Sequence, residues 1–359
     1  MNNNVVFLLP DIKGGGAEKS VINLCLSIQS HSNYTCHLLV LGNISEYNID
    51  SVNVQFLDIR SKIKKSGIHR LTYRVKAAKY VDNFITDNFG ESTTVFSNML
   101  LCDKIMSESK LNVYNIIRNS YGSSQLNGKS WFKKKMEIHN ISKTYNNHPL
   151  IFVSQGAMDS FCKHFHSDVP KTVIYNAIDV DNIRSFSNEY YPKKSDYILH
   201  IGRFNHQKRH DNLLKIYAQT TINHDLYIMG QGELKESIEQ GIEKHDIKNR
   251  VRLIDFTSNP YPYIKHSSIV LLTSDFEGLP RVMMEAVALN KPVVAFDCTG
   301  GIREVITNPN CLVPMGDIDG FKEKIQDAIT SPKKYISKQR QEFSPKYVAK
   351  QFIDLIKGD

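Results

Sequence analysis

The most informative stretch of the sequence spans 268–285 and reads Ser268-Ile-Val-Leu-Leu-Thr-Ser-Asp-Phe-Glu-Gly-Leu-Pro-Arg-Val-Met-Met-Glu285. The run 268–274 is largely apolar, which is typical of a strand buried on both faces. Apolar residues then recur at helical spacing over 279–290. We therefore expect Glu277 in the loop that joins a strand to a helix, and Glu285 within that helix.

The carboxylates of Glu277 and Glu285 stand on either side of the start of this helix. Ligands of open parallel sheets bind at the carboxyl edge of the strands, where Glu277 is expected. A carboxylate near a helix N-terminus is favoured in its ionised form by the free N–H groups and the dipole. An ionised acceptor beside exposed amides suits a polyol such as a sugar. Two glutamates at this spacing are also common on solvated helix faces. The other motifs must therefore show whether the pair belongs to a ligand site.

The composition is that of an ordinary globular protein. The 359 residues allow two domains, and 41% hydrophobic and 23% charged residues are usual values. The sequence shows no run approaching the roughly 18 apolar residues of a membrane span and no basic signal-peptide start. Six cysteines without C-x-x-C spacing indicate a reducing, cytosolic setting rather than a disulfide framework or a zinc site.

Strand-like runs alternate with helical stretches along the whole chain, which is typical of parallel sheets covered by helices. More than a dozen strands exceed one comfortable open sheet, so we expect two doubly wound domains. The polar stretch 179–194 is the natural linker. The expected strands are 5–10, 37–41, 54–59, 94–97, 112–117, 150–154, 171–175, 197–202, 226–230, 251–255, 269–274, 292–297 and 311–314.

A run of glycines follows the first expected strand. The segment Lys13-Gly14-Gly15-Gly16-Ala17-Glu18 leads into an apolar-periodic helix. Consecutive glycines let the backbone approach a ligand closely, and the N-terminus of the next helix favours an anion. The segment matches neither the dinucleotide fingerprint nor the P-loop, and a tight turn without a ligand would also explain it.

Two cations and another glycine loop occupy the corresponding place in the second half. Arg203 follows Gly202 at the end of an expected strand, and Lys208 comes shortly after. A guanidinium fork and an ammonium point charge can neutralise a diphosphate, solvated surface cations being the plain alternative. Gly230-Gln-Gly-Glu233 follows the next strand at the same edge. Together with the two carboxylates, these features predict a diphosphate that carries two hydroxylated groups, a nucleotide sugar.

The net charge of +8 is concentrated in the first half. Residues 1–176 carry 20 Lys and Arg against 13 Asp and Glu, and the segment 60–79 contains eight basic residues and no acid. This pattern suits an anionic membrane surface, with a solvated surface as the plain alternative. No nucleic-acid motif accompanies the charge, so we expect no nucleic-acid partner. A second basic cluster with aromatic neighbours consists of Lys129, Trp131, Phe132, Lys133, Lys134 and Lys135.

With these features in order along nearly the whole chain, the sequence resembles a retaining glycosyltransferase of family 4 with the GT-B fold. Each motif is common by itself, but the ordered set is highly specific. The set comprises Gly14-Gly15-Gly16-Ala17-Glu18, Asn176-Ala-Ile-Asp179, Gly202-Arg203 with Lys208, Gly230-Gln-Gly-Glu233, the pair Glu277 and Glu285, and Gly300-Gly-Ile-Arg-Glu304.

The resemblance implies an α/β architecture of two doubly wound Rossmann-like domains that face each other across a cleft. It assigns 1–176 to an acceptor-binding domain, 177–195 to a linker and 196–343 to a nucleotide-sugar-binding domain. The last segment, 344–359, would form a helix that crosses back to the first domain.

The resemblance also assigns roles to single residues. Glu277 would meet the hydroxyls of the donor sugar and Glu285 those of the ribose. Arg203 and Lys208 would bind the diphosphate, and with Glu277 they are the predicted catalytic residues. Gly15 and Gly16 would close over the donor from the first domain. The predicted donor-binding set also contains Gly230 and the backbone N–H groups of Gly278 and Leu279.

One departure from the family pattern concerns the end of the fifth expected strand. Many relatives place a histidine there, close to the donor sugar, whereas this chain continues as Ile117-Arg118-Asn119-Ser120. Arg118 or Asn119 is the candidate replacement on the acceptor and donor-sugar side.

The implied reaction transfers a hexose or N-acetylhexosamine from a nucleotide diphosphate sugar to an acceptor hydroxyl with retention of configuration. UDP is the expected nucleotide because it is frequent in the family. Arg203 and Lys208 would stabilise the charge on the departing diphosphate in place of a metal. No Asp-x-Asp follows an expected strand, so we expect no metal and no other cofactor.

Three other classes of protein share some of these features. The main alternative is a catalytically inactive, nucleotide-sugar-binding partner subunit of a glycosyltransferase complex, which would need lesions in the Arg, Lys and Glu set that the sequence does not show. An epimerase of the same fold would lack the spacing of Glu277 and Glu285 combined with that of Arg203 and Lys208. A dinucleotide oxidoreductase would need the Rossmann fingerprint followed by an acid about 20 residues later.

The expected acceptor and setting follow from the resemblance to bacterial transferases of O-antigen, lipopolysaccharide, capsule and exopolysaccharide synthesis. It implies a peripheral enzyme on the inner face of the cytoplasmic membrane that meets a lipid-linked saccharide. The basic segments Arg60 to Lys79 and Lys129 to Lys135 would bind the anionic membrane surface.

Overall fold

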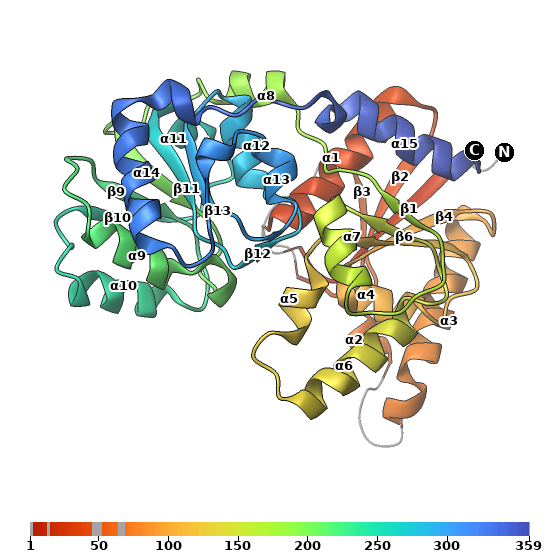
Figure 1. Cartoon of the computed structure of the whole chain (residues 1–359). Helices are drawn as coiled ribbons and strands as arrows, with labels where there is room; N and C mark the ends of the chain where they lie inside the picture. The colour runs from red at the N-terminus through yellow and green to blue at the C-terminus, as the bar shows by residue number, and fades with distance from the viewer. Residues whose placement is uncertain (1–2, 13–14, 45–51, 64–68, 359) are drawn as a thin grey trace. The chain divides into compact units, whose positions relative to one another are not determined.

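The computed structural model describes residues 3–12, 15–44, 52–63 and 69–358 (Figure 1). The chain forms two compact units: unit 1 comprises Met1–Ala177 and Glu342–Asp359, and unit 2 comprises Ile178–Gln341. Each unit is built on one parallel sheet flanked by helices, which confirms the predicted class of two doubly wound, Rossmann-like units.

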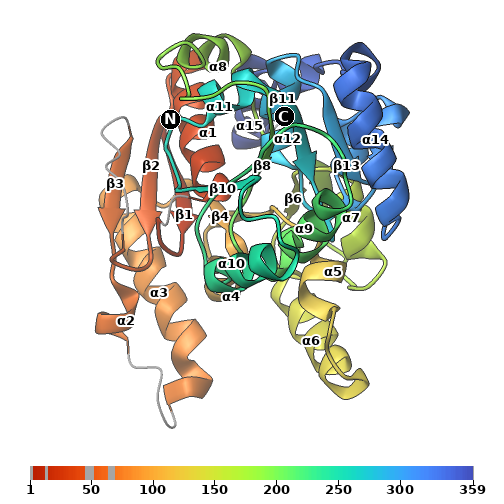
Figure 2. The ribbon, with the colours of Figure 1, turned by 90° about the vertical axis from the view of Figure 1, so that its left-hand side faces the viewer.

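The sheet of unit 1 has the strand order β3-β2-β1-β4-β5-β6-β7, and all of its pairs are parallel. Figure 2 shows β3, β2 and β1 side by side. Nearly every residue of β1 is fully buried, as expected for a strand covered on both faces. Its strands are β1 (Asn4–Leu9), β2 (Thr35–Val40), β3 (Asn53–Phe56), β4 (Thr94–Asn98), β5 (Asn112–Ile117), β6 (Leu150–Phe152) and β7 (Lys171–Val173).

The sheet of unit 2 has the order β10-β9-β8-β11-β13-β15 and is also parallel. When the strands are counted within each unit, both sheets therefore begin 3-2-1-4-5-6. In this doubly wound order, the direction in which strands are added to the sheet reverses after the third strand, and strand 4 pairs with strand 1. The strands are β8 (Tyr197–Ile201), β9 (Leu226–Met229), β10 (Val251–Ile254), β11 (Ser267–Leu272), β13 (Val293–Phe296) and β15 (Leu312–Val313).

The helices of unit 1 include the last one in the chain, α15, which packs against α1. The Ser27 hydroxyl donates to the carbonyl of Pro345 at 2.8 Å, and the ring of Phe352 lies 5.1 Å from that of Phe96 in the sheet. Burying such a ring stabilises the fold by about 1.5–3 kcal/mol. The helices are α1 (Gly16–His31), α2 (Ile59–Lys62), α3 (His69–Phe89), α4 (Met99–Met106), α5 (Tyr121–Leu126), α6 (Trp131–Thr144), α7 (Gln155–Cys162) and α15 (Pro345–Lys357).

The helices of unit 2 form two groups, since α14 packs on β11, β13 and α9, whereas α12 packs on β11, β13, α8 and α11. The helices are α8 (Val180–Phe186), α9 (His210–Ala218), α10 (Lys235–Lys244), α11 (Tyr261–His266), α12 (Arg281–Ala288), α13 (Ile302–Val305) and α14 (Ile318–Thr330). The 3-10 turns of the chain are η1 (His206–Lys208), η2 (Pro309–Cys311), η3 (Pro332–Tyr335) and η4 (Gln341–Phe343).

Several local boundaries differ from those expected. Helix α12 begins only at Arg281, because Pro280 has an extended backbone and occupies the N-cap position. Glu277 does not lie in an irregular loop but in the two-residue strand β12 (Phe276–Glu277), which pairs with β14 (Thr299–Gly300). The range expected as a linker contains α8, which packs against α11 and α12 of unit 2. A pairing of two-residue strands, such as β12 with β14, is too short to show a periodic pattern in the sequence.

A buried polar network lies in the core of unit 1. Asp103 is fully buried, and its carboxylate accepts hydrogen bonds of 2.6 Å from the Ser97 and Tyr145 hydroxyls. The hydroxyls of Tyr145 and Tyr121 lie 2.9 Å apart. Burial raises the pKa of Asp103 from 3.8 to about 7, although both hydroxyl hydrogen bonds and the charge of Arg118 oppose the shift. Unit 1 therefore contains a carboxyl group that titrates near neutral pH.

This network makes stability depend on pH. Because the folded state binds the proton of Asp103 more tightly than the unfolded state, its contribution is complete below about pH 4 and is lost as the pH rises through about 7. Asn at position 103 resembles the protonated side chain. The stability of Asp103→Asn relative to wild type should therefore increase by about 2 kcal/mol as the pH is raised from 5 to 8. Thermal denaturation midpoints at each pH measure the difference. Asp87→Asn, at an exposed carboxylate of α3, is the control, and parallel pH profiles for Asp103→Asn and wild type would refute the prediction.

Candidate functional site

The carboxyl ends of the central strands β8 and β11 are adjacent in unit 2, at the point where the strand order reverses. In open parallel sheets, ligands bind at this switch point. The predicted residues Arg203 and Lys208 lie in the segment after β8, and Glu277 lies in the segment after β11. The topology therefore brings these three predicted residues to one edge of the sheet.

Hydrogen bonds join the two segments at this edge. The side-chain amide of Gln207 donates to the carbonyl of Phe276 at 2.8 Å. The Thr273 hydroxyl donates to the carbonyl of Lys208 at 2.9 Å. The segment that carries Lys208 is therefore held directly against the segment that carries Glu277.

Lys208 and Glu277 form an ion pair, with Nζ 2.6 Å from Oε1. Their side chains are only 15% and 9% exposed. A charge that is buried this far needs a counter-charge, and each of the two residues supplies it for the other. Both residues were predicted at the site, Lys208 as a ligand of the diphosphate and Glu277 as a ligand of the donor sugar. Their direct contact was not predicted and is a finding of the structure.

Gly300 allows a close approach to the backbone of Glu277. Gly300 has a φ of +112°, and a Cβ atom there would lie 1.6 Å from the carbonyl oxygen of Glu277. Their two short strands pair in parallel, and the N–H of Gly301 donates to the carbonyl of Gly278 at 3.0 Å. Glycine is therefore required at 300, because a side chain would force the two segments apart.

The predicted glycine loop after β9 packs on the segment after β8. Gly230 has a φ of +155°, and a Cβ there would lie 2.0 Å from the carbonyl oxygen of Gly202. Gly232 has a φ of +152°, and a Cβ there would lie 2.5 Å from the carbonyl oxygen of Phe204. Arg203 lies between these two contacts with an exposed side chain. Glycines thus let two loops converge on the segment that presents Arg203.

Glu285 lies on α12, as predicted, and is 5% exposed. Its Oε1 accepts a hydrogen bond of 2.9 Å from Nε of Arg281, one turn earlier. The contact engages one of the two carboxylate oxygens. Gly278 and Leu279, whose N–H groups were predicted to hold the ligand, are buried and directly precede Pro280 and α12.

Two buried histidines lie close to Lys208, and no pattern in the sequence pointed to them. The rings of His200 in β8 and His210 in α9 lie 4.9 Å apart, and none of their nitrogens has a hydrogen-bond partner among the described residues. Burial lowers the pKa of both, to about 4 for His210, and the charge of Lys208 acts in the same direction. At pH 7 both rings are neutral and add no positive charge beside Lys208.

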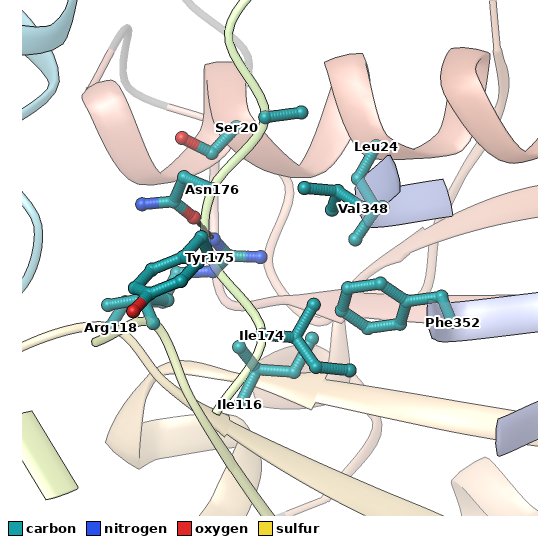
Figure 3. A pocket seen from close by; sticks show the side chains of 11 residues that line it. Ser20, Leu24, Ile116, Arg118, Ile174, Tyr175, Asn176, Val348 and Phe352 are labelled. Carbon is teal, nitrogen blue, oxygen red and sulfur yellow. Dashed lines mark hydrogen bonds between the residues drawn. The ribbon is translucent and has the colours of Figure 1, made fainter. Parts of the chain in front are cut away.

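Unit 1 presents polar groups at the carboxyl edge of its own sheet (Figure 3). Arg118 follows β5, its Nε donates to Oδ1 of Asn98 at 2.9 Å, and its Nη1 donates to Oδ1 of Asn176 at 2.7 Å. Asn98, the last residue of β4, is fully buried. Figure 3 shows Arg118 and Asn176 beside a small cavity that Ser20 of α1 also lines. Two neutral amides therefore fix the orientation of the guanidinium.

The other predicted residues of unit 1 have backbone or local roles. Gly15 is the N-cap residue of α1 and Gly16 is its first residue, while the two residues before them, Lys13 and Gly14, lie outside the described residues. The side chain of Asn119 accepts a hydrogen bond of 2.9 Å from the N–H of the next residue. The predicted residues thus divide into a set in unit 1 and a set in unit 2.

Several residues that shape the site carry no recognisable signal in the sequence. Gln207, Thr273 and Asn98 act through hydrogen bonds to segments far away in the chain. Asn176, in contrast, opens the Asn176-Ala-Ile-Asp179 motif, which could have directed attention to it. Across the described ranges, no group of three or more His, Cys, Asp or Glu side chains is placed to hold a metal ion.

A family model described as glycosyl transferases group 1 matches residues 181–346, a range that includes Arg203, Lys208, Glu277 and Glu285. The solved structure of Anabaena HepE in complex with UDP and glucose is similar over 99% of this chain and all of that one, with a TM-score of 0.77. At 16% identity this likeness shows the fold alone. The chain therefore has the GT-B fold, and its residues 181–346 are similar to glycosyl transferases group 1. The finer assignment to family 4 stays a prediction.

Two relatives of known activity are similar in sequence. The N-acetylgalactosamine-N,N'-diacetylbacillosaminyl-diphospho-undecaprenol 4-alpha-N-acetylgalactosaminyltransferase of Campylobacter jejuni is 29% identical over 81% of this chain and 80% of that enzyme. The lipopolysaccharide 1,6-galactosyltransferase of Salmonella typhimurium is 29% identical over 57% of this chain. That match spans 59% of the Salmonella enzyme.

Replacing Gly300 by Ala should impair nucleotide binding, because the added Cβ must displace the carbonyl of Glu277. Gly316→Ala is the matched control, since Gly316 also has a positive φ, +83°, but no described atom lies within 4 Å of a Cβ there. Both variants should lose about 1 kcal/mol of stability from the positive φ, and Gly300→Ala should lose more because its Cβ also meets backbone. Only Gly300→Ala should lose affinity for a nucleotide, by about tenfold in calorimetry. Equal affinities in the two variants would contradict this.

Proposed function

We propose that the protein is a retaining, metal-independent glycosyltransferase. It moves a hexose or N-acetylhexosamine from a UDP-sugar to a lipid-linked saccharide in bacterial surface polysaccharide synthesis. The observation that carries the proposal is the Lys208–Glu277 pair at the switch point of unit 2, within the range matched by the glycosyl transferases group 1 model. UDP is chosen as the nucleotide because the similar HepE structure contains UDP.

The donor would bind along the carboxyl edge of the sheet of unit 2. The largely buried ammonium of Lys208 and the exposed guanidinium of Arg203 suit the diphosphate. The carboxylate of Glu277, held by Lys208, can accept hydrogen bonds from hydroxyls of the transferred sugar. Glu285 retains a second carboxylate oxygen beside the one that contacts Arg281, and that oxygen suits the ribose hydroxyls.

The pairing of Lys208 with Glu277 also bears on the chemical step. As the bond to the anomeric carbon breaks, negative charge grows on the diphosphate and positive charge on the sugar. An ammonium and a carboxylate fixed 2.6 Å apart are already oriented, so they can stabilise these opposite charges without reorganising. In the proposed mechanism a phosphate oxygen of the donor takes the proton of the acceptor hydroxyl, and no side chain is needed as the base.

The relatives support a lipid-linked acceptor. By its name, the Campylobacter jejuni enzyme acts on a sugar linked to diphospho-undecaprenol, and the Salmonella enzyme is a lipopolysaccharide galactosyltransferase. We infer that this chain takes an acceptor of the same chemical class, a saccharide on a lipid diphosphate. Such an acceptor stays in the bilayer, so the enzyme must work at the surface of the cytoplasmic membrane.

Helix α6 in unit 1 supports this setting. Trp131 and Phe132 in its first turn are 74% and 65% exposed, and Met136 in the next turn is 53% exposed. The lysines at 133–135 are exposed among them, and Nζ of Lys135 lies 5.5 Å from the ring centre of Trp131. Large apolar side chains next to several cations suit the interface of an anionic bilayer.

The second basic segment, 60–79, is described only in part. Lys64 and Lys65 lie outside the described residues, and the side chains of Lys76 and Lys79 are exposed on α3. Among the helices within the described ranges, none is long and apolar enough to cross a bilayer. We therefore propose a peripheral attachment of unit 1 through α6, with α3 as a further basic surface.

Calorimetry with UDP, GDP, ADP, CMP and their common sugars tests the donor site. We expect saturable binding of the UDP series, weakened about tenfold or more in Glu285→Ala because the ribose loses its acceptor. Glu239→Ala, at an exposed glutamate of α10, is the control. With the donor identified, transfer should persist in EDTA and give a product with the anomeric configuration of the donor. Binding of no nucleotide by folded protein would favour the inactive partner subunit, and loss of transfer in EDTA would refute metal independence.

Charge reversal on α6 tests the membrane attachment. Changing Lys133, Lys134 and Lys135 together to Glu should weaken binding to anionic liposomes by at least about tenfold, at about 1 kcal/mol for each basic residue near the surface. The matched control, with the same change in net charge, reverses the exposed Lys248, Lys333 and Lys338 of unit 2 and should bind as wild type does. Cosedimentation with vesicles measures both, and equal binding by the two triple variants would refute a specific role of α6.

A further inference from the structure

Unit 2 contains a groove of about 640 Å³ between α9, α10 and the segment after β8. Its volume lies within the range of about 300–1,000 Å³ that is usual for small-molecule sites. Arg203, Lys208, Glu277 and Glu285 all lie in the described part of the chain, and none of them lines this groove. The groove is therefore a second concave site, distinct from the proposed donor site.

One side of the groove is formed by charges centred on Arg209. Its Nη1 donates to Oδ1 of Asp275 at 3.0 Å. Its Nε and Nη2 donate to the carboxylate of Asp211 at 2.9 and 2.8 Å. The hydrogen bonds from Arg209 lower the pKa of Asp211, so this carboxylate stays ionised. The groove is thus bordered by two fixed carboxylates, and the single positive charge of the guanidinium compensates one of their two negative charges.

The other side of the groove belongs to α10. Ser237, Gln240 and Lys244 line it with exposed side chains that carry a hydroxyl, an amide and an ammonium group. Leu214 of α9 and Ile238 of α10 are buried and contribute apolar surface. Hydrogen-bond donors and acceptors are therefore combined with an apolar patch in one site.

This combination discriminates between ligand classes. A polyanion would find no surplus of positive charge, because Arg209 and Lys244 are matched by Asp211 and Asp275. A hydrocarbon chain would leave the polar walls without partners. The aromatic rings among the described residues that line the groove are the imidazoles of His206, His210 and His245, which give a nucleobase less stacking surface than phenyl, phenol or indole rings. A sugar presents hydroxyls that both donate and accept, together with C–H faces that suit Leu214 and Ile238. We propose that this groove binds a neutral saccharide of about one to three units.

The groove and the donor site share one loop. The side chain of Lys208 reaches Glu277, whereas that of Arg209 reaches Asp211 and Asp275 in the groove. Arg209 has a φ of +49°, a left-handed conformation that is uncommon for a residue with a side chain, and it directs consecutive side chains to different sites. The saccharide would therefore contact Arg209 of this loop, whereas Lys208 belongs to the proposed donor site, and its binding does not depend on the proposed activity.

Saturation-transfer NMR on the full chain tests the proposal, with N-acetylglucosamine, N-acetylgalactosamine and chitobiose as probes at about 10 mM. We expect saturation transfer to at least one probe in wild type and its loss in Gln240→Trp, which fills the groove. Glu239→Trp, at the neighbouring exposed residue that does not line the groove, should retain the signal. Glu277→Gln should also retain it, because the donor site is not involved.

Three results would overturn the proposal: no transfer to any probe in wild type, an undiminished signal in Gln240→Trp, or a signal lost in Glu277→Gln. Thermal denaturation confirms that each variant is folded, and Ser237→Trp fills the same groove should Gln240→Trp not fold. Calorimetry measures the binding of UDP by the same samples. A failure of the donor proposal is therefore separated from a failure of the groove proposal.

Discussion

The ion pair between Lys208 and Glu277 joins segments that leave two adjacent strands, β8 and β11, at the switch point of a parallel sheet. A nearly buried charge is tolerated only beside its counter-charge, so both segments must keep their places for the pair to persist. Gln207 secures the contact with a backbone hydrogen bond, and Gly300 allows a neighbouring strand to support Glu277. The geometry of the proposed donor site therefore depends on this pair.

The two units hold their polar groups in different ways. In unit 2 a carboxylate neutralises the buried cation, whereas in unit 1 the guanidinium of Arg118 is oriented by the neutral side chains of Asn98 and Asn176. Amide oxygens orient a cation and leave its formal charge in place, so Arg118 remains suited to an anionic group of a substrate. In α4 of the same unit, burial of Asp103 instead raises its pKa to about 7.

Much of the fold and part of the site could be predicted, and particular residues show where prediction ends. The expected runs overlap every strand of both main sheets, because the buried strands of a parallel sheet are mostly apolar. Glu277, Glu285, Arg203 and Lys208 were predicted as site residues from their types and order, and the structure places Arg203, Lys208 and Glu277 at one edge of the sheet. The contact of Lys208 with Glu277 was not predicted, because 69 positions separate the two residues in the chain and no local pattern records their approach.

The sequence by itself determined the two doubly wound units and the chemical groups at their strand ends, because periodicity, glycine runs and charge are local properties of a chain. Only the tertiary structure decided which groups touch. Gly300 beside Glu277, Arg209 between Asp211 and Asp275, and Arg118 between two asparagines all depend on the meeting of distant segments. Such contacts arise when parallel strands bring their carboxyl ends to one edge, since side-chain geometry there is set by packing and hydrogen bonding across the sheet.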